Sequence, residues 1–194
     1  MVYMWQVLAQ DACRACHNQS EQREVHARVK LLSHDEAEVW QQFQRGLSTS
    51  AIAKTNPKKS WSVSYVSRVL NRAREKITKT LQDHAQSHRL DVESVLDYKG
   101  LLIGFDYQAN AQVFICYTMK LGVVVWYSHD SYAGKLCPDC PKQAECRETL
   151  RTIREEYGIQ LRADEEKLYM TQRSTVIFNK LAAKESPRYQ RSVS

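Results

Sequence analysis

The chain has 194 residues, of which 43% are hydrophobic and 26% are charged. This length accommodates one ordinary domain or two small ones, and the composition is that of a soluble globular protein and excludes low-complexity sequence. No apolar run reaches the roughly 18–20 residues of a transmembrane helix, and the N-terminal segment lacks the features of a signal peptide. We therefore expect a cytoplasmic protein with reduced thiols and no membrane partner.

The positive charge is unevenly distributed. The formal net charge is +6, of which residues 1–33 carry +1, residues 34–90 carry +5, and residues 91–194 carry none. A local excess of Lys and Arg suits a phosphate-binding module, because neutralising phosphates releases condensed counterions. A solvated helix face would carry the same charge, so charge alone leaves both interpretations open.

Residues 1–33 are expected to form a helical extension or to be flexible. They contain Cys13-Arg-Ala-Cys16-His17, which has the form of a c-type haem attachment motif. That attachment takes place outside the cytoplasm, and two incidental thiols are the preferred interpretation. A second metal-binding pair is the alternative.

Residues 34–90 are predicted to be helical. Ser33 and Glu36 have the spacing of a capping box, and Gly46 ends the first helix. A short second helix holds Ala51–Ala53, and a long third helix runs from Val63 to His88. The apolar stripe of the long helix exceeds the length that a recognition helix needs. Its C-terminal half is therefore expected to pack on its own chain or on a second subunit.

Residues 91–185 are predicted to form a small antiparallel sheet followed by helices, and residues 186–194 to form a tail. Three segments rich in Val, Ile, Tyr and Phe predict strands: Gly100–Asp106, Ala111–Thr118 and Leu121–Ser128. Helices are expected at Glu145–Tyr157, Asp164–Tyr169 and Gln172–Ala183. The fold class is therefore α+β, with an N-terminal three-helix domain at residues 34–90 and a C-terminal domain at residues 91–185.

Two runs within residues 34–80 resemble a known DNA-binding motif. The run GLSTSAIAK from Gly46 to Lys54 resembles the G-L-S-x-x-E-I-A start of the LuxR-type and sigma-factor region-four helix-turn-helix. The run VSRVLNRAREKI from Val66 to Ile77 resembles the third helix of the sigma type. The turn is about three residues longer than in that family and lacks its glycine. The resemblance implies double-stranded DNA as a partner, with RNA polymerase as a further candidate.

In such a motif the N-terminal residues of the third helix approach base edges, and flanking cations contact phosphates. Hydroxyl groups and Arg at the start of the long helix suit the first role, and the cations of the turn and of the later helix suit the second. The candidate DNA-binding residues are Lys58, Lys59, Ser62, Ser64, Tyr65, Ser67, Arg68, Arg72, Arg74 and Lys76.

A cysteine cluster lies about 60 residues beyond this segment. Cys137, Cys140 and Cys146 form a C-x2-C-x5-C run, whose thiolates suit zinc or an iron–sulfur cluster. The run resembles the C-x2-C-P-x4-C pattern of WhiB-like iron–sulfur regulators. Cys116 is the expected fourth ligand of a [4Fe–4S] cluster, and His129 is the alternative that suits Zn²⁺. Cys13 or Cys16 could serve only if the N-terminal segment docks against the site. A buried, metal-free thiol is the other interpretation of Cys116.

No phosphate-binding glycine loop and no hydrolase motif is present, so we do not expect an enzyme. The sequence favours a sequence-specific transcriptional regulator, dimeric through the long helix or the sheet, whose [4Fe–4S] cluster senses redox state, oxygen or nitric oxide. One alternative is a zinc-stabilised DNA-binding regulator without redox sensing. Another is an iron–sulfur DNA-processing enzyme. The sequence specifies neither the operator nor the signal.

Overall fold

The computed structural model describes residues 31–55, 59–128 and 142–184. These residues form six α-helices and one four-stranded antiparallel sheet, which confirms the α+β class. The helices are α2 (His34–Gln44), α3 (Thr49–Thr55), α4 (Val63–Ser87), α5 (Gln143–Tyr157), α6 (Ala163–Glu166) and α7 (Met170–Ala183). The strands are β1 (Asp91–Leu96), β2 (Leu101–Asp106), β3 (Ala111–Thr118) and β4 (Gly122–Tyr127), and the short 3-10 helix η2 (Asp97–Lys99) joins β1 to β2.

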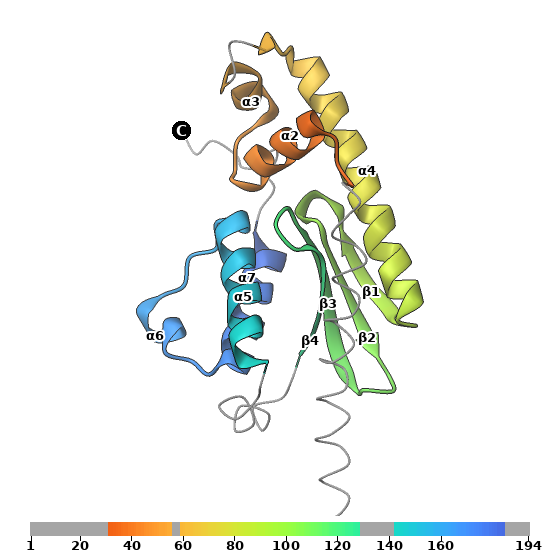
Figure 1. The fold of residues 1–194 in the computed structure, drawn as a ribbon, viewed down its shortest axis with the longest axis vertical. Helices are drawn as coiled ribbons and strands as arrows, with labels where there is room; N and C mark the ends of the chain where they lie inside the picture. The colour runs from red at the N-terminus through yellow and green to blue at the C-terminus, as the bar shows by residue number, and fades with distance from the viewer. Residues whose placement is uncertain (1–30, 56–58, 129–141, 185–194) are drawn as a thin grey trace, which may run out of the picture.

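The sheet has the order β1-β2-β3-β4 and lies between two helical layers (Figure 1). Side chains alternate between its two faces because the strand period is two residues. On β3, Val113 and Ile115 face α4, whereas Phe114 and Cys116 face α5 and α7. Both faces are thus apolar, which explains why β3 is an almost continuous hydrophobic run with buried residues from Val113 to Thr118.

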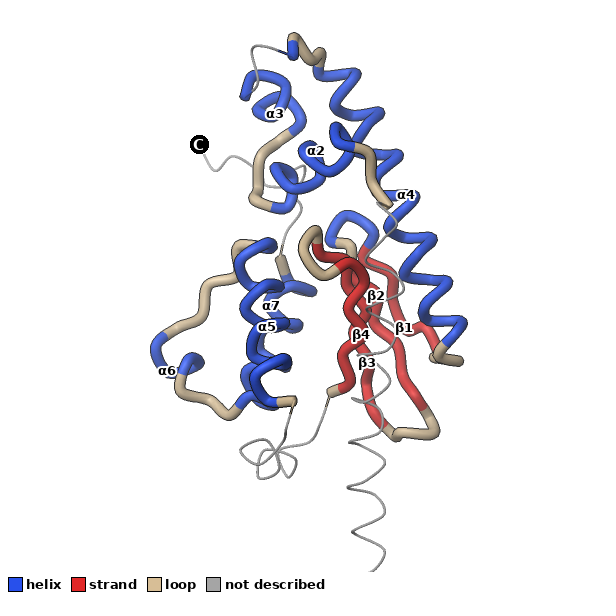
Figure 2. Tube along the Cα trace, viewed as in Figure 1, coloured by secondary structure: helices blue, strands red, loops and turns tan. Residues whose placement is uncertain are grey.

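The helix α4 joins the two parts of the molecule. Its N-terminal half packs against α2 and α3, and its C-terminal half packs against the sheet (Figure 2). Ile77, Leu81 and Ala85 are at most 1% exposed in an apolar core that runs from α2 to the sheet. Of the two expected arrangements, packing on its own chain is therefore the observed one. The stripe is not available to a second subunit, and the expected domain boundary at residue 90 falls inside a continuous core.

The capping and hydrophobic patterns of the sequence predicted the positions of most helices and strands correctly. Ser33 and Glu36 form the expected capping box, with the Ser33 N–H donating to Glu36 Oε2 at 2.8 Å. The expected long helix, Val63 to His88, is observed as Val63–Ser87. The three expected strands are observed within two residues of their predicted bounds. The strand β1 was not predicted.

The helices α2 and α5 meet the sheet at Gly100. This residue has φ +57°, and a Cβ built on it would lie 2.8 Å from Trp40 Cζ2 and 3.1 Å from the Tyr157 hydroxyl. The Tyr157 hydroxyl donates to the Tyr117 carbonyl oxygen at 2.6 Å. Lys184, at the end of α7, donates to the carbonyl oxygens of Gln44 and Tyr157. Close packing and hydrogen bonds thus hold α2, the sheet, α5 and α7 together at one point.

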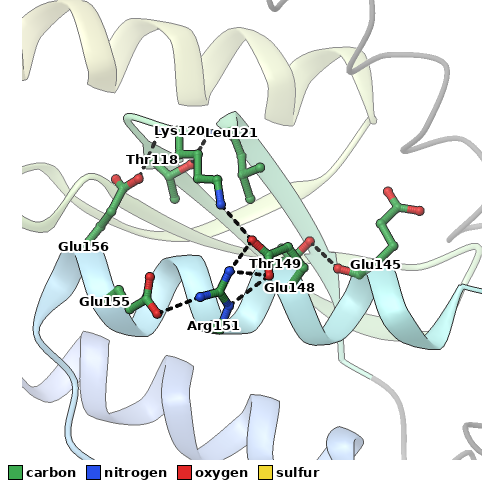
Figure 3. Close-up of polar contacts among 9 residues, drawn as sticks. All are labelled: Thr118, Lys120, Leu121, Glu145, Glu148, Thr149, Arg151, Glu155 and Glu156. Carbon is green, nitrogen blue, oxygen red and sulfur yellow. Dashed lines mark hydrogen bonds and ion pairs between the residues drawn. The ribbon is translucent and has the colours of Figure 1, made fainter.

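The turn between β3 and β4 is fastened to α5 (Figure 3). The Glu156 carboxylate accepts hydrogen bonds from the N–H groups of Met119 at 2.6 Å and Lys120 at 2.9 Å. Lys120 Nζ lies 2.7 Å from Glu148, which also pairs with Arg151. The carboxylates of α5 therefore orient the turn. Together with the interleaved basic residues they form a solvent-exposed face of α5.

Candidate nucleic-acid interface

The N-terminal half of α4 presents a polar stripe to solvent. Ser62 is the N-cap residue, and its Oγ accepts a hydrogen bond from the Tyr65 N–H at 3.1 Å. Ser64, Arg68 and Arg72 are exposed and follow one another at four-residue steps on one face of the helix. Hydroxyl and guanidinium groups with this spacing can contact bases and phosphates along one groove.

Ion pairs and a hydrogen bond connect the turn before α4, and the first turn of α4 itself, to α2. Lys59 Nζ lies 3.0 Å from Asp35 Oδ1 and 2.7 Å from Glu38 Oε2, and it also lies 4.6 Å from the centroid of the Trp61 ring. The Tyr65 hydroxyl donates to Asp35 Oδ2 at 2.7 Å. This hydrogen bond and that from Lys59 hold the pKa of Asp35 below its ordinary value. These contacts fix the start of α4 relative to α2 and neutralise Lys59.

A buried carboxylate underlies the middle of α4. Glu36 is 4% exposed, and Lys76 Nζ lies 2.7 Å from its Oε2. Arg72 Nε is more distant, at 4.0 Å from Oε1, and its side chain remains 60% exposed. Burial raises the pKa of Glu36, but the hydrogen bonds from Lys76 and from the Ser33 N–H outweigh it, so that the pKa lies below 4.5. Glu36 is therefore ionised at neutral pH and anchors α4 through Lys76.

Replacing Glu36 by Gln is expected to lower the free energy of unfolding at pH 7 by about 2 kcal/mol, because a charged hydrogen-bonding partner of Lys76 is lost. The depressed pKa of Glu36 stabilises the wild type fully above pH 4.5 and progressively less as the pH falls through the folded-state pKa. The difference between wild type and variant should therefore shrink below pH 4.5. Urea unfolding between pH 3 and 7 measures it.

Glu75→Gln is the matched control, since Glu75 is exposed on the same helix. This variant should stay close to the wild type at every pH, because exposed ion pairs contribute little. A Glu36→Gln variant as stable as the control at pH 7 would contradict the anchoring role.

Arg74 lies at the junction with η2. Its Nη2 pairs with Asp97 Oδ2, and its guanidinium carbon lies 3.5 Å from the centroid of the Tyr98 ring. Three of the expected phosphate contacts, Lys59, Arg74 and Lys76, are thus engaged in ion pairs within the chain. Lys58 lies outside the described residues. Arg68, Arg72 and Lys76 are the exposed cations among the described residues of the predicted set, and of these Lys76 lies 2.7 Å and Arg72 4.0 Å from Glu36.

Sequence reasoning missed the acidic partners of these cations and one residue of the stripe. The partners are Asp35, Glu36 and Glu38 of α2, which lie more than 20 positions from Lys59 and Lys76. No local pattern pairs residues across such a distance.

The residue of the polar stripe that the sequence analysis missed is Asn71, which is exposed between Arg68 and Arg72. Its spacing of three residues from Arg68 would have indicated that it shares their face.

The cysteines of the expected metal site are only partly described. Cys146 lies half-buried in the first turn of α5, next to the point where residues 129–141 join the helix. Cys137, Cys140 and His129 lie outside the described residues, as do Cys13 and Cys16. Among the residues that the structure describes, no three His, Cys, Asp or Glu side chains form a group able to hold a metal ion.

Cys116 lies beside Tyr157 at the C-terminal end of α5, whereas Cys146 lies in the first turn of that helix. Cys116 is 0% exposed, and burial raises the pKa of its thiol well above the ordinary value, so the thiol stays protonated. Its neighbour Tyr117 accepts the hydrogen bond from Tyr157, which is three turns beyond Cys146, or about 16 Å along the helix axis. Sulfurs that share one zinc ion lie about 4 Å apart, because each Zn–S bond is about 2.3 Å long. Cys116 is therefore poorly placed to share a metal site with Cys146.

Comparison with models of known families, with curated proteins and with solved structures found no match for this chain. Within the described ranges, no helix is both long enough and apolar enough to span a membrane.

Proposed function

We propose that the protein is a sequence-specific DNA-binding transcriptional regulator. In this proposal α2, α3 and α4 act as a helix-turn-helix, and the N-terminal half of α4 enters the major groove. The observation that carries the proposal is the exposed stripe of Ser64, Arg68, Asn71 and Arg72 on a helix whose opposite face is firmly anchored. The net charge of +5 in residues 34–90 supports it.

The side chains of the stripe have the chemistry that DNA recognition requires. An Arg side chain can donate two hydrogen bonds to guanine, and an Asn side chain can pair with adenine. The ion pairs of Lys59 and Lys76 with α2 have a different role, because they hold α4 in a fixed orientation. Preorganisation of this kind reduces the entropic cost of binding.

Replacing both Arg68 and Arg72 by Ala should weaken DNA binding and flatten its dependence on salt. The slope of log K against log salt concentration is negative, and each lost phosphate contact reduces its magnitude by about 0.9, so the loss of two such contacts reduces it by about 1.8. Fluorescence anisotropy with a labelled duplex, titrated at several salt concentrations, measures both effects.

The control is the double variant Arg147→Ala and Lys167→Ala. It removes the same two charges from exposed positions outside α4. Its salt slope should equal that of the wild type. If the two double variants lose affinity and slope equally, binding depends on net charge alone and α4 is not the interface.

We further propose that Cys137, Cys140 and Cys146 bind a metal group. A [4Fe–4S] cluster would give the regulator a sensor of redox state, oxygen or nitric oxide, and Zn²⁺ would instead stabilise the fold. The burial of Cys116 beside Tyr157 supports the zinc alternative, because it weighs against Cys116 as the fourth ligand and leaves only Cys13 or Cys16, which lie outside the described residues, for an all-cysteine set. With His129 the set becomes three Cys and one His, which is a common structural zinc site.

A further inference from the structure

A cavity of about 440 Å³ lies where α3, α4 and η2 approach one another. Two aromatic side chains form one end of it. Phe43, near the end of α2, and Tyr98, in η2, have ring centroids 6.1 Å apart and ring planes inclined at 42°. The volume lies within the range of roughly 300–1,000 Å³ that is typical of small-molecule binding sites.

The other described residues that line the cavity are uncharged, and all of them except Leu70 are polar. Thr49 and Ser50 of α3 line one side, and Ser67 and Asn71 of α4 line the other. Asn71 Oδ1 accepts a hydrogen bond from Arg74 Nη1 at 3.1 Å, which leaves the amide N–H groups of Asn71 for a ligand. None of the described residues that line the cavity is Asp, Glu, Lys, Arg or His.

The aromatic end of the cavity is held rigidly. The Arg74 guanidinium stacks on the Tyr98 ring at 3.5 Å and is itself paired with Asp97. Gln44 Nε2 donates to the Tyr98 carbonyl oxygen at 2.8 Å, which fixes the backbone of η2. A ligand would therefore not have to order the Tyr98 side chain or the backbone of η2, which lowers the cost of binding.

We propose that this cavity binds an uncharged aromatic heterocycle that carries hydroxyl groups, which is the chemistry of a nucleoside. Phe43 is 4% exposed and the Arg74 guanidinium covers one face of the Tyr98 ring, so the heterocycle would contact the accessible edges of these rings and Leu70. The hydroxyls of Thr49, Ser50 and Ser67 and the amide of Asn71 offer hydrogen bonds for sugar hydroxyls and base edges. No charged side chain is among the described lining residues, and the nearby Arg74 is already paired with Asp97, which favours a neutral ligand over a phosphorylated one.

Isothermal titration calorimetry of the full chain with adenosine, guanosine, cytidine and uridine tests the proposal. At least one nucleoside should bind with a dissociation constant below about 1 mM. Ser50→Phe, which fills the cavity from an exposed helix position, should weaken that binding by roughly tenfold or more. Asn71→Ala should weaken it in the same direction through a lost hydrogen bond. Circular dichroism would establish that both variants are folded.

Thr55→Phe is the matched control, because Thr55 is exposed on the same helix and does not line the cavity. It should bind as the wild type does. Absence of binding for all four nucleosides, or equal binding by Ser50→Phe and Thr55→Phe, would overturn the proposal.

A second titration uses a single-stranded oligonucleotide in place of the nucleosides. If it binds while the free nucleosides do not, the proposal of a small-molecule site is also overturned. The titration with nucleosides contains no duplex DNA, so its result is independent of the proposed regulator function.

Discussion

Replacement of Gly100 by Ala is expected to lower the free energy of unfolding by about 3 kcal/mol. Two costs contribute. Gly100 has φ +57°, and a residue with a Cβ is disfavoured by about 1 kcal/mol in this left-handed conformation. The new Cβ would also lie 2.8 Å from Trp40 Cζ2, and such overpacking of a buried contact typically costs about 1–3 kcal/mol.

Gly158→Ala separates the two costs. Gly158 has φ +62°, but a Cβ built on it meets nothing within 4 Å. This variant should therefore lose only the conformational part, about 1 kcal/mol. Urea unfolding of both variants and the wild type, followed by the fluorescence of the four Trp residues, measures the difference. Equal losses in the two variants would mean that Trp40 moves aside without cost and that α2 is not rigidly packed on the sheet.

Replacement of Cys140 by Ser is expected to abolish metal binding, whereas replacement of Cys116 by Ser should leave it unchanged. Ser is a poor substitute for a thiolate ligand, so the first variant loses the site that the C-x2-C-x5-C run would form. The second variant instead places a hydroxyl in the apolar core between the sheet and α5, at a cost in stability of about 1–3 kcal/mol.

The measurement is elemental analysis for zinc and iron, with acid-labile sulfide and a visible spectrum, on protein purified without oxygen. Iron with sulfide would establish a cluster, and about one zinc ion per chain would establish a structural site. A wild type without either metal would exclude the proposed metal site. Loss of metal in Cys116→Ser, with the fold intact, would show that the separation of Cys116 from Cys146 does not prevent shared ligation.

The helices could be predicted where a local pattern determines them. The apolar stripe from Val66 to Leu81 defines α4, because its residues recur every three or four positions and all become buried. By contrast, β1 begins with the exposed residues Asp91, Val92 and Glu93 at the edge of the sheet. An edge strand with this composition carries little alternation, and its pairing with β2 is a contact that the segment itself does not encode.

The sequence places the basic residues of the candidate interface but not their ion-pair partners. Basic residues after Lys54 are visible in the sequence, but their partners are not. Lys76 pairs with Glu36 across 40 positions, and Arg74 pairs with Asp97 across 23. Such pairs form only when α2 and η2 pack on α4, so sequence spacing cannot separate the cations that anchor the helix from Arg68, which is exposed.

The length of α4 has a mechanical consequence. Its 25 residues span about 37 Å at about 1.5 Å per residue, and they pass without interruption from the sheet to the polar stripe. A tilt of roughly 5° about the sheet end would displace the other end by about 3 Å, which is the length of one hydrogen bond. Because Lys59 and Lys76 pair with α2, a tilt of this kind would carry α2 and the exposed residues Ser64 and Arg68 with α4 as one unit.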